Sequence, residues 1–537
     1  MDVRILCLLL LLNNGLCSSF ELSKEFDVKP LIRDFRDKNT YIRARNEMIF
    51  AESNMRIGHD IVLNNQEQKV NQKLMKYKQL EINESRVQNG KPFPPSVSFL
   101  TGKPLVEKSQ VFQMIKLMPK GAALHLHDCS MVDLKWLVKN ATYRDHCFMC
   151  TTVKHAVYFK FFGGTPPDNP DCPWKSVKTE RQKARSIDEF DNMLYMNMSL
   201  ITPDPVKAYP TIDVVWARFL QVLNQANGLI NYTPVFTDYF YEALSEFNLD
   251  NVQYLEFRGL LPQVYELDGT TRNRDWVMKT YNDIFEKFVA DHKNEFTGGK
   301  VIYSGIRVVP EIDVLNQVKE AVRFRQMYPS HFAGYDLVGQ EDPGVPLISY
   351  VDALLYPSEH IPPIDLPYFF HAGETDWEGT PTDRNLIDAV LLNTSRIGHG
   401  YALTKHPQVM KVVKERGIAI EVNPISNQVL ALVSDLRNHP AADLVATDFP
   451  VVISADDPSV WGARGLSYDF YMAFMALAGE TTDLRLLKKL SMNSIQYSAM
   501  NPVEKGKAMN LWRQKWNAFI QQALHQLNQS GEISVFG

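Results

Sequence analysis

Residues 119–128 read Pro-Lys-Gly-Ala-Ala-Leu-His-Leu-His-Asp, which places His125 and His127 two positions apart in an apolar run. A β-strand points residues i and i+2 to the same face, so both imidazoles can reach one point. Converging neutral imidazoles are typical ligands of zinc and related ions. A His-x-His pair standing alone would more often be two unrelated strand histidines, so the rest of the chain has to decide.

Three further motifs follow, each at the carboxyl end of a short β-rich run. They are His371-Ala372-Gly373-Glu374, Arg396-Ile397-Gly398-His399-Gly400 and Ser454-Ala455-Asp456-Asp457-Pro458. Together they supply a third imidazole, an acid, a further histidine and a pair of carboxylates. With the His-x-His pair, this set predicts a mononuclear zinc hydrolase.

From about residue 120 onward, eight β-rich runs alternate with helical stretches. The runs are 123–127, 252–258, 301–309, 332–338, 368–371, 395–399, 418–423 and 451–455. Eight strands with helix-length connections predict an α/β fold, a (β/α)₈ TIM-type barrel with its catalytic groups at the carboxyl ends of the strands. A doubly wound open sheet is the structural alternative, but the chain has no Gly-rich phosphate loop.

Composition is that of an ordinary soluble globular protein. The chain has 57 basic and 62 acidic residues among 537, a net charge of −5. This balance argues against a nucleic-acid binder that works by phosphate neutralisation. No stretch after the N-terminus approaches the ~20 continuous apolar residues of a membrane span.

The N-terminus has the pattern of a secretory signal peptide over residues 1–19. Residues 5–12 are apolar, and small or polar residues surround an expected cleavage point at 17–19. The apolar run is too short to cross a bilayer; a buried N-terminal helix or strand is the alternative. We therefore expect a secreted, extracellular glycoprotein. The Asn-x-Ser/Thr sequons are Asn83, Asn140, Asn197, Asn231, Asn393 and Asn528.

Two additions to the barrel are expected. Apolar residues at helical spacing between Ile42 and Leu80 predict two long helices in an N-terminal extension over 20–108, before the barrel domain at 109–537. These helices precede the metal motif, so they would pack on the core or on a second subunit. The long gap after the first strand predicts an inserted lobe at 140–200, near the active-site face.

Four cysteines remain after cleavage at the expected point: Cys129, Cys147, Cys150 and Cys172. In an oxidising compartment a disulfide that pins the lobe is the default expectation. The Cys147-x-x-Cys150 spacing also suits a zinc knuckle, but no second pair follows at a matching distance. A structural zinc in the lobe is therefore not favoured.

The motifs suggest a division of roles at the barrel mouth. The expected ligands of a single zinc are His125, His127, His371 and Asp456. Some barrel hydrolases hold a second metal through a lysine after strand four. Here that strand ends in residues 336–341, Asp-Leu-Val-Gly-Gln-Glu, with no lysine, so one metal is expected.

Three residues beside those ligands are candidates for acid, base and substrate contact. Glu374 could be a general acid, His399 could hold or deprotonate the attacking water, and Asp457 could face the substrate while its neighbour binds metal. Each has a plain structural alternative: a solvated loop acid, a satisfied core histidine and an acidic turn before Pro458. Their shared position at strand ends favours catalysis.

These four motifs, in this order, resemble the adenosine deaminase family. The signal peptide, helical extension, Cys-bearing insertion and Pro-Lys-Gly-Ala lead-in resemble its secreted branch, the adenosine deaminase-related growth factors. The resemblance implies hydrolytic deamination of adenosine, and of 2′-deoxyadenosine, to inosine and ammonia. It also implies a homodimer and a Cys150–Cys172 disulfide.

The resemblance further implies roles at the site. Zinc would sit on the four ligands above, Glu374 would donate a proton to purine N1, His399 would be the base at the zinc water, and Asp457 would contact purine and water. The nucleoside site would be lined by Asp128, Trp216, Gly305 and Gly339, with the Gly339 amide near the ring. The His-x-Glu and Pro-Cys-x-x-Cys signature of cytidine-type deaminases is missing.

Two other readings stay open from the sequence. One is a metal-dependent barrel hydrolase that acts on a different ring or amide. The other is a secreted growth-factor-like ligand whose lobe or helices bind a cell-surface receptor or glycan. An intact set of metal and acid–base residues counts against a purely non-enzymatic role.

Overall fold

The computed structural model describes residues 37–87 and 90–529. The chain divides into two compact units, residues 1–55 and 56–537, which we describe separately. The expected signal peptide at 1–19 lies outside the described residues. Among those residues, no helix combines the length and apolarity that crossing a bilayer requires.

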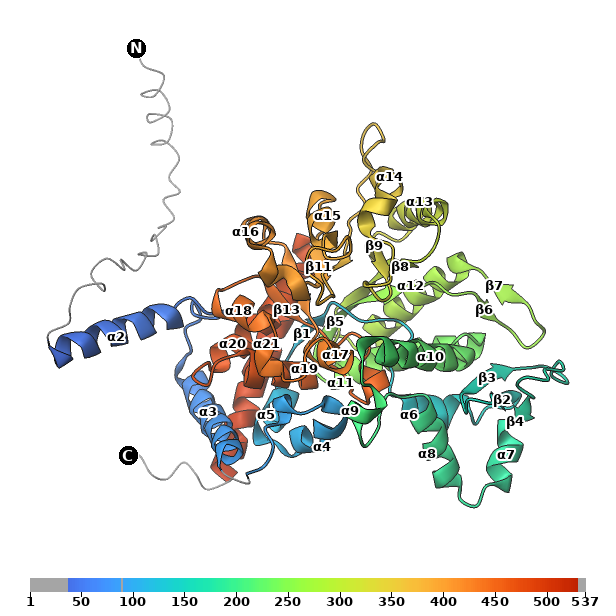
Figure 1. The fold of residues 1–537 in the computed structure, drawn as a ribbon, viewed down its shortest axis with the longest axis horizontal. Coiled ribbons are helices and arrows are strands. Elements are labelled where there is room, and N and C mark those ends of the chain that lie inside the picture. Colours follow the sequence, from blue (N-terminus) through green and yellow to red (C-terminus); the bar gives the residue numbers. More distant parts are fainter. Residues whose placement is uncertain (1–36, 88–89, 530–537) are drawn as a thin grey trace, which may run out of the picture. The chain divides into compact units, whose positions relative to one another are not determined.

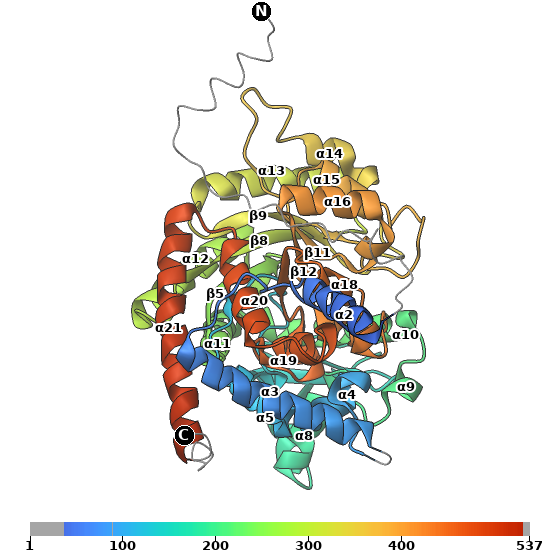
Figure 2. The same ribbon diagram turned by 90° about the vertical axis from the view of Figure 1, so that its left-hand side faces the viewer.

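Eight parallel strands of the second unit form a barrel surrounded by helices (Figures 1 and 2). The strands are β1 Gly121–Ala123, β5 Val252–Gly259, β8 Gly298–Ile306, β9 Phe332–Val338, β10 His371–Ala372, β11 Arg396–His399, β12 Ala419–Val422 and β13 Val451–Ile453. They pair in chain order as two four-stranded sheets, β1-β5-β8-β9 and β10-β11-β12-β13. The parallel bridges Tyr335–Tyr368 and Leu126–Asp456 join these sheets on both sides. The predicted (β/α)₈ barrel is confirmed.

The strands are short and buried on both faces, as parallel strands under a layer of helices must be. All eight residues of β5 and all seven of β9 are buried. The surrounding helices are α11 Thr233–Leu249, α12 Arg274–Asp291, α13 Glu311–Met327, α14 Val351–Leu355, α15 Asn385–Leu391, α16 Pro407–Arg416, α17 Pro424–Val429, α18 Ala441–Ala446, α19 Ser467–Met472 and α20 Leu484–Gln496. In α12 the buried residues Val277, Tyr281, Ile284 and Phe288 recur every three or four positions, which gives the helix one apolar face.

Both predicted N-terminal helices are present, as α2 Lys38–Ser53 and α3 Asn65–Arg86. In the second unit, α3 begins with a capping box between Asn64 and Glu67 and packs against α5 Gln110–Leu117 and α21 Pro502–Gln529 (Figure 2). The short helix α4 Phe99–Lys108 connects this extension to α5. The second predicted helix therefore packs on the barrel domain of its own chain.

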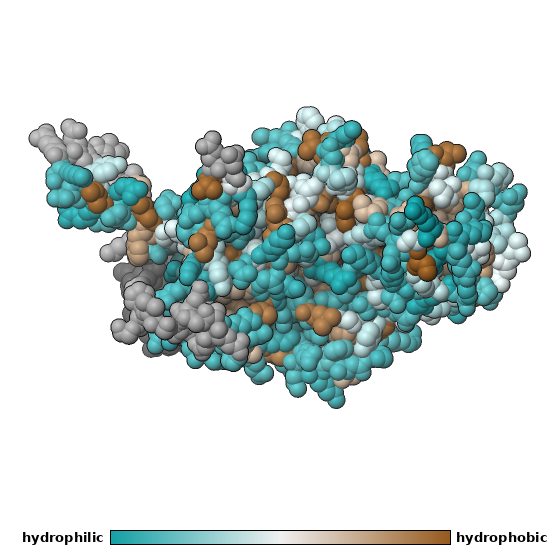
Figure 3. Space-filling model, turned by 90° about the horizontal axis from the view of Figure 1, so that it is seen from below, coloured by the Kyte–Doolittle hydropathy of each residue, from teal (hydrophilic) through white to brown (hydrophobic). Residues whose placement is uncertain are grey.

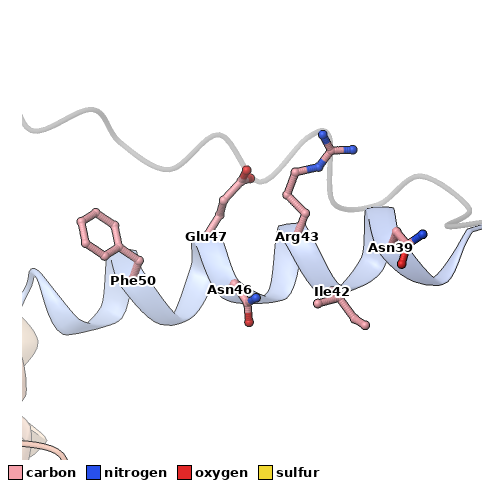
Figure 4. Close-up of a pocket in the computed structure, with 6 residues that line it drawn as sticks. All are labelled: Asn39, Ile42, Arg43, Asn46, Glu47 and Phe50. Atoms are coloured by element: carbon pink, nitrogen blue, oxygen red, sulfur yellow. The ribbon is translucent and has the colours of Figure 1, made fainter.

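Helix α2 belongs to the first unit and buries none of its residues. Figure 4 shows Ile42 and Phe50 projecting from it, and 40% and 68% of their surface is exposed. Figure 3 shows brown side chains among the teal ones along this helix. Met48 and Ile49 of the same helix are exposed as well, at 41% and 47%.

The predicted insertion is a small lobe between β1 and β5. It contains the antiparallel sheet β3-β2-β4, formed by Val157–Phe161, Cys147–Thr151 and Lys175–Ser176. Its helices and those that lead to the barrel are α6 Leu134–Trp136, α7 Val177–Lys183, α8 Ile187–Asn197, α9 Pro205–Ala208 and α10 Ile212–Ile230. A hairpin that the sequence did not predict, β6 Val264–Tyr265 and β7 Thr271–Arg272, follows β5.

The expected Cys150–Cys172 disulfide is confirmed and ties β2 to the segment before β4. Cys129 and Cys147 are free thiols, and both are buried. Cys150 and Cys172 thus form the disulfide of the lobe, as expected, and Cys147 does not take part in it.

Candidate metal centre and active site

The four expected metal ligands meet at the carboxyl end of the barrel. His125 and His127 follow β1, His371 begins β10, and Asp456 follows β13. One ligand atom from each residue lies within 4.8 Å of the corresponding atoms of the other three. Backbone pairing between the segments after β1 and β13 holds them there: Asp456 N donates to His125 O and His127 N donates to Asp456 O.

The backbone at this site adopts unusual conformations. His399 and Asp456 have φ angles of 61° and 60°, in the left-handed region that side chains other than glycine rarely occupy. A Cβ on Gly398 would lie 3.0 Å from His125 Cε1 and 3.2 Å from His371 Cα. Glycine in the Arg-Ile-Gly-His-Gly motif therefore makes room for two of the ligand residues.

Two buried carboxylates stand behind the imidazoles. His125 Nδ1 lies 2.7 Å from Glu421 Oε2, and His371 Nδ1 lies 2.6 Å from Asp336 Oδ2. A carboxylate can only accept, so each Nδ1 carries the hydrogen and each Nε2 keeps its lone pair toward the cluster. This is how carboxylates orient metal-binding histidines.

Buried arginines keep these carboxylates ionised. Arg258 donates to Asp336 at 3.0 Å and to Glu421 at 2.7 Å, and Arg396 donates to Glu421 at 2.6 Å. Burial by itself would raise the pKa of both acids. The partners outweigh it: the hydrogen bond from His371 and the charge of Arg258 hold the pKa of Asp336 below its usual range, and the charges of Arg258 and Arg396 do so for Glu421.

The donor atoms at the centre fit a divalent metal. His125 Nε2 is buried and has no hydrogen-bond partner among the described residues. Asp456 Oδ1 lies 3.3 Å from His125 Nε2 and 3.0 Å from His127 Nε2. Three imidazole nitrogens beside one carboxylate oxygen, with no better partner, form a donor set that suits a borderline ion such as Zn²⁺.

Glu374 stands next to this group as a buried carboxyl. Burial, with Asp456 and Glu341 nearby, raises its pKa well above the usual range. Its backbone N–H donates to Glu341, whose carboxylate is held by Arg307 at 3.0 Å. The chain thus fixes the position of a buried acid whose protonated form is favoured by its surroundings.

His399 lies on the other side of the same space. Burial lowers its pKa well below the usual value, so the ring is neutral. Its Nε2 is 3.7 Å from Asp456 Oδ2 and has no hydrogen-bond partner among the described residues. A neutral imidazole therefore faces the metal group with one free nitrogen.

Two further acids complete the polar wall. Burial raises the pKa of Asp457 to about 7; neighbouring Asp456 acts in the same direction, and His127 opposes it. Asp457 accepts a hydrogen bond from the Ser130 hydroxyl. Burial likewise raises the pKa of Asp128 to about 6, and its Oδ2 accepts from Tyr281 Oη at 3.0 Å. Both can contribute a proton near neutrality.

These groups line one cavity together with an apolar wall. The lining residues are His127, Asp128, Cys129, Trp216, Phe219, Leu220, Leu223, Leu260, Ile306, Val338, Gly339, His371, Glu374, His399, Leu430, Asp456 and Asp457. Four of them, at i, i+3, i+4 and i+7, come from α10, beginning at Trp216. The cavity pairs acidic and metal-binding groups with an apolar side, which suits an uncharged heterocycle.

The structure brings every predicted site residue to this cavity or directly beneath it, with one exception. His125 lies buried under the cavity. Gly305 is not among the lining residues: a Cβ there would point toward Gln317 Oε1 of α13 at 2.1 Å and Tyr335 Oη of β9 at 2.5 Å. The next residue along β8, Ile306, lines the cavity instead.

Two family models match the chain. The model described as Adenosine deaminase matches residues 202–511, and the one described as Adenosine/AMP deaminase N-terminal matches residues 8–115. The chain belongs to the adenosine deaminase family. Adenosine deaminase 2 from Pongo abelii is 47% identical to this chain over 478 residues, which cover 89% of this chain and 93% of that protein. Adenosine deaminase from Phlebotomus duboscqi is 42% identical over 493 residues, covering 91% and 94%.

Solved structures of deaminases share the fold. Arabidopsis ADAL complexed with IMP superposes with a TM-score of 0.54 at 17% identity, covering 75% of this chain and 99% of that one. The adenine deaminase of Arthrobacter aurescens gives a TM-score of 0.52 at 18% identity, covering 74% and 98%. At these identities the likeness concerns the barrel architecture alone.

Sequence reasoning missed the residues that support the deaminase site from behind. They are Arg258, Arg307, Asp336, Glu341, Arg396 and Glu421. A usable signal was present: Asp336 and Glu421 interrupt otherwise apolar strands that must be buried on both faces, where an unpaired charge is costly. A charge inside such a strand indicates a partner elsewhere, although the sequence does not say which one.

Proposed function

We propose that this member of the family is a secreted, zinc-dependent adenosine deaminase that hydrolyses adenosine and 2′-deoxyadenosine to inosine and ammonia. The observation that carries the proposal is the position of Glu374. A buried carboxyl of raised pKa lies in the cavity beside a donor set of three histidines and one aspartate, of which His127, His371 and Asp456 line the same cavity. Amidine hydrolysis needs that pair: a hydroxide source at the carbon and a proton for the ring nitrogen.

The metal would be one Zn²⁺ per chain, held by His125, His127, His371 and Asp456. When bound, zinc lowers the pKa of a water to about 7 and so supplies hydroxide at neutral pH. The tautomers set by Glu421 and Asp336 support this ligand set. The segment after β9 offers no lysine to bridge a second metal, which supports a single ion.

The chain's own groups would divide the remaining work. Glu374 would protonate purine N1 as hydroxide adds at C6, and His399 would hold or deprotonate the attacking water. Asp457 would contact purine and water, while Gly339 would offer its amide to the ring. Asp128 would face the nucleoside as well.

Trp216 would form part of the apolar wall for the base. It lies on the face of α10 that lines the cavity, next to Phe219. We assign no contact to Gly305, since it is not among the residues that line the cavity.

The direct test is the loss of adenosine absorbance with purified, zinc-replete protein. A panel of nucleosides, cyclic amides and phosphoesters run in parallel separates deamination from the other barrel hydrolases. We expect turnover of adenosine and 2′-deoxyadenosine and none of the cyclic amides or phosphoesters. Turnover of another class with none of adenosine would contradict the proposal.

The remaining parts of the chain fit the same proposal. We propose a signal peptide at 1–19, a dimerising extension at 20–108 and a deaminase barrel at 109–537 that carries the lobe at 140–200. Support for dimerisation comes from α2, whose apolar side chains such as Ile49 and Phe50 are exposed. A monomer in light scattering at micromolar concentration would count against it.

A further inference from the structure

His399 Nδ1, the ring nitrogen that points away from the metal group, belongs to a buried series of hydrogen bonds between side chains. Asn427 Nδ2 lies 3.0 Å from His399 Nδ1, and Asn427 Oδ1 lies 2.9 Å from His439 Nε2. Asn427 sits in α17, and His439 precedes α18. All three residues are at most 2% exposed, so bulk water does not compete for these contacts.

A backbone N–H group fixes the orientation of His439, the last side chain of this hydrogen-bond series. The N–H of Ala441 points at His439 Nδ1 at 3.0 Å. A backbone N–H can only donate, so Nδ1 must carry a lone pair and the hydrogen of His439 must be on Nε2. Burial lowers the pKa of His439 to about 3, in keeping with a neutral ring. The rings of His439 and Tyr401 also pack in a T-shaped arrangement, with centroids 5.2 Å apart.

The donor and acceptor of each hydrogen bond in the series can then be assigned in turn. His439 Nε2–H donates to an oxygen, which fixes the Asn427 amide with Oδ1 toward His439. Nδ2 is left facing His399, and as an amide nitrogen it can only donate. His399 Nδ1 is therefore an acceptor, and the neutral ring has its hydrogen on Nε2. The orientation of the amide, which is normally a matter of assignment, is decided here by a backbone group.

We propose that Asn427 and His439 are positioning residues that hold neutral His399 with its hydrogen on Nε2, directed at the metal group. His399 then holds the attacking water by donating a hydrogen bond to its oxygen, and does not take its proton. This inference rests on the proposed deaminase function and decides between the two roles left open for His399 there.

A competing contact on the same nitrogen is weaker. Glu374 Oε1 lies 3.5 Å from His399 Nδ1, beyond the usual length of an N–H···O hydrogen bond. Asn427 Nδ2 is closer, at 3.0 Å. The free Nε2 has no partner among the described residues, as expected for a donor directed at a site that a ligand completes.

The variant that tests this hydrogen-bond series is Asn427→Asp. It keeps size and shape but replaces the donor facing His399 with an acceptor, while still accepting from His439. His399 must then carry hydrogen on Nδ1, so the donor to the water is lost from the neutral ring. We expect full zinc content, KM within a few-fold of wild type and kcat lower by roughly 10²-fold, the usual effect of losing one aligned donor.

Two further variants separate positioning from general damage. Asn438→Asp makes the same change at the exposed residue next to His439 and should leave zinc and turnover unchanged. His439→Gln retains one donor and one acceptor in the series and should recover part of the turnover that His439→Leu loses. If Asn427→Asp keeps kcat within a few-fold of wild type at full zinc, the proposal is wrong.

The tautomer itself can be read without any turnover. Protein labelled with ¹⁵N-histidine, free of substrate, shows which ring nitrogen of each histidine bears hydrogen. His399→Asn and His439→Gln assign the two signals among the 13 histidines. We expect hydrogen on Nε2 in both; hydrogen on Nδ1 of His399 would overturn the proposal. Because this reading needs no substrate, it stands or falls separately from deamination of adenosine.

Discussion

The metal group and helix α3 both bury charged side chains, yet they satisfy them differently. In α3, the Glu67 carboxylate receives Lys488 at 2.5 Å, Trp516 at 2.7 Å and the Asn64 backbone N–H at 2.8 Å. Lys78, also in α3 and fully buried, donates to two backbone carbonyls and lies 4.0 Å from the centre of the Phe474 ring. Here each charge finds its partners within the chain.

At the barrel mouth, partners are missing on one side only. His125 Nε2, His399 Nε2 and Asp456 Oδ1 are buried without a hydrogen-bond partner among the described residues, while the opposite nitrogens of both histidines are bonded. Single unpaired buried atoms also occur elsewhere in the described chain, as at Gln253, Tyr254 and Trp512. What marks a ligand site is that several such atoms converge here on one metal-binding group, whereas the buried charges of α3 have partners on every side.

If that distinction holds, the largest effect comes from removing a metal ligand. His371→Ala takes away one of the four donors and leaves Asp336 buried beside a cavity. We expect zinc content to fall below a tenth of an equivalent and adenosine turnover to disappear, measured by elemental analysis and absorbance on one sample. A variant that keeps a full equivalent of zinc would remove His371 from the ligand set.

Replacement of Glu374 tests the catalytic role of the metal site separately from metal binding. Glu374→Gln keeps size and reach but has no proton to give to N1, so charge would build on the ring as hydroxide adds. We expect zinc and substrate binding to be retained and kcat to fall roughly 10²–10⁴-fold, as for other positioned general acids. Turnover within a few-fold of wild type at full zinc would mean that Glu374 is not the proton donor.

Substitution of the buried charges of α3 should lower the free energy of unfolding without changing the turnover of the folded protein. Glu67→Ala leaves Lys488 without its carboxylate, and breaking a buried pair typically costs about 3 kcal/mol. The exposed Glu84→Ala, on the same helix, is the matched control and should change the free energy of unfolding by less than about 0.5 kcal/mol. Urea unfolding measures both. If Glu67→Ala lowers the turnover per folded molecule, the pairing at α3 does not act on stability alone, and this prediction is wrong.

The last expected effect is a pH dependence of stability at Lys78. Burial lowers its pKa in the folded protein from 10.5 to about 7, so between these values the unfolded chain binds this proton and the folded chain does not. The free energy of unfolding should therefore rise with pH in this window, by up to roughly 1.4 kcal/mol per unit.

Comparison with Lys78→Met isolates this contribution from the other titrating groups. Relative to the variant, wild type should gain stability between pH 7.5 and pH 9.5 in urea unfolding. A flat difference would show that Lys78 remains charged in the folded protein throughout that range.

The sequence predicted what local patterns encode. The proposed ligands, Glu374 and His399 could be singled out because each lies in a short motif at a strand end. The position of Gly305 outside the cavity lining could not be foreseen, because a glycine has no side chain whose pattern reveals which face of a strand it occupies.

The supporting groups could not be paired from the sequence. Arg258 meets Glu421 across 163 positions, and Asn427 joins His399 to His439 only after α17 has folded beside β11. Contacts of that kind depend on the closure of the barrel. Composition or periodicity does not report them.

The central claim is that the unpaired atoms at the barrel mouth hold one zinc for adenosine deamination. The most direct test strips the purified protein of metal and then restores Zn²⁺ in measured steps while adenosine turnover is recorded. Turnover should be absent without metal and should rise linearly to a plateau at one equivalent per chain. Turnover that survives complete metal removal, or a plateau only at two equivalents, would contradict it.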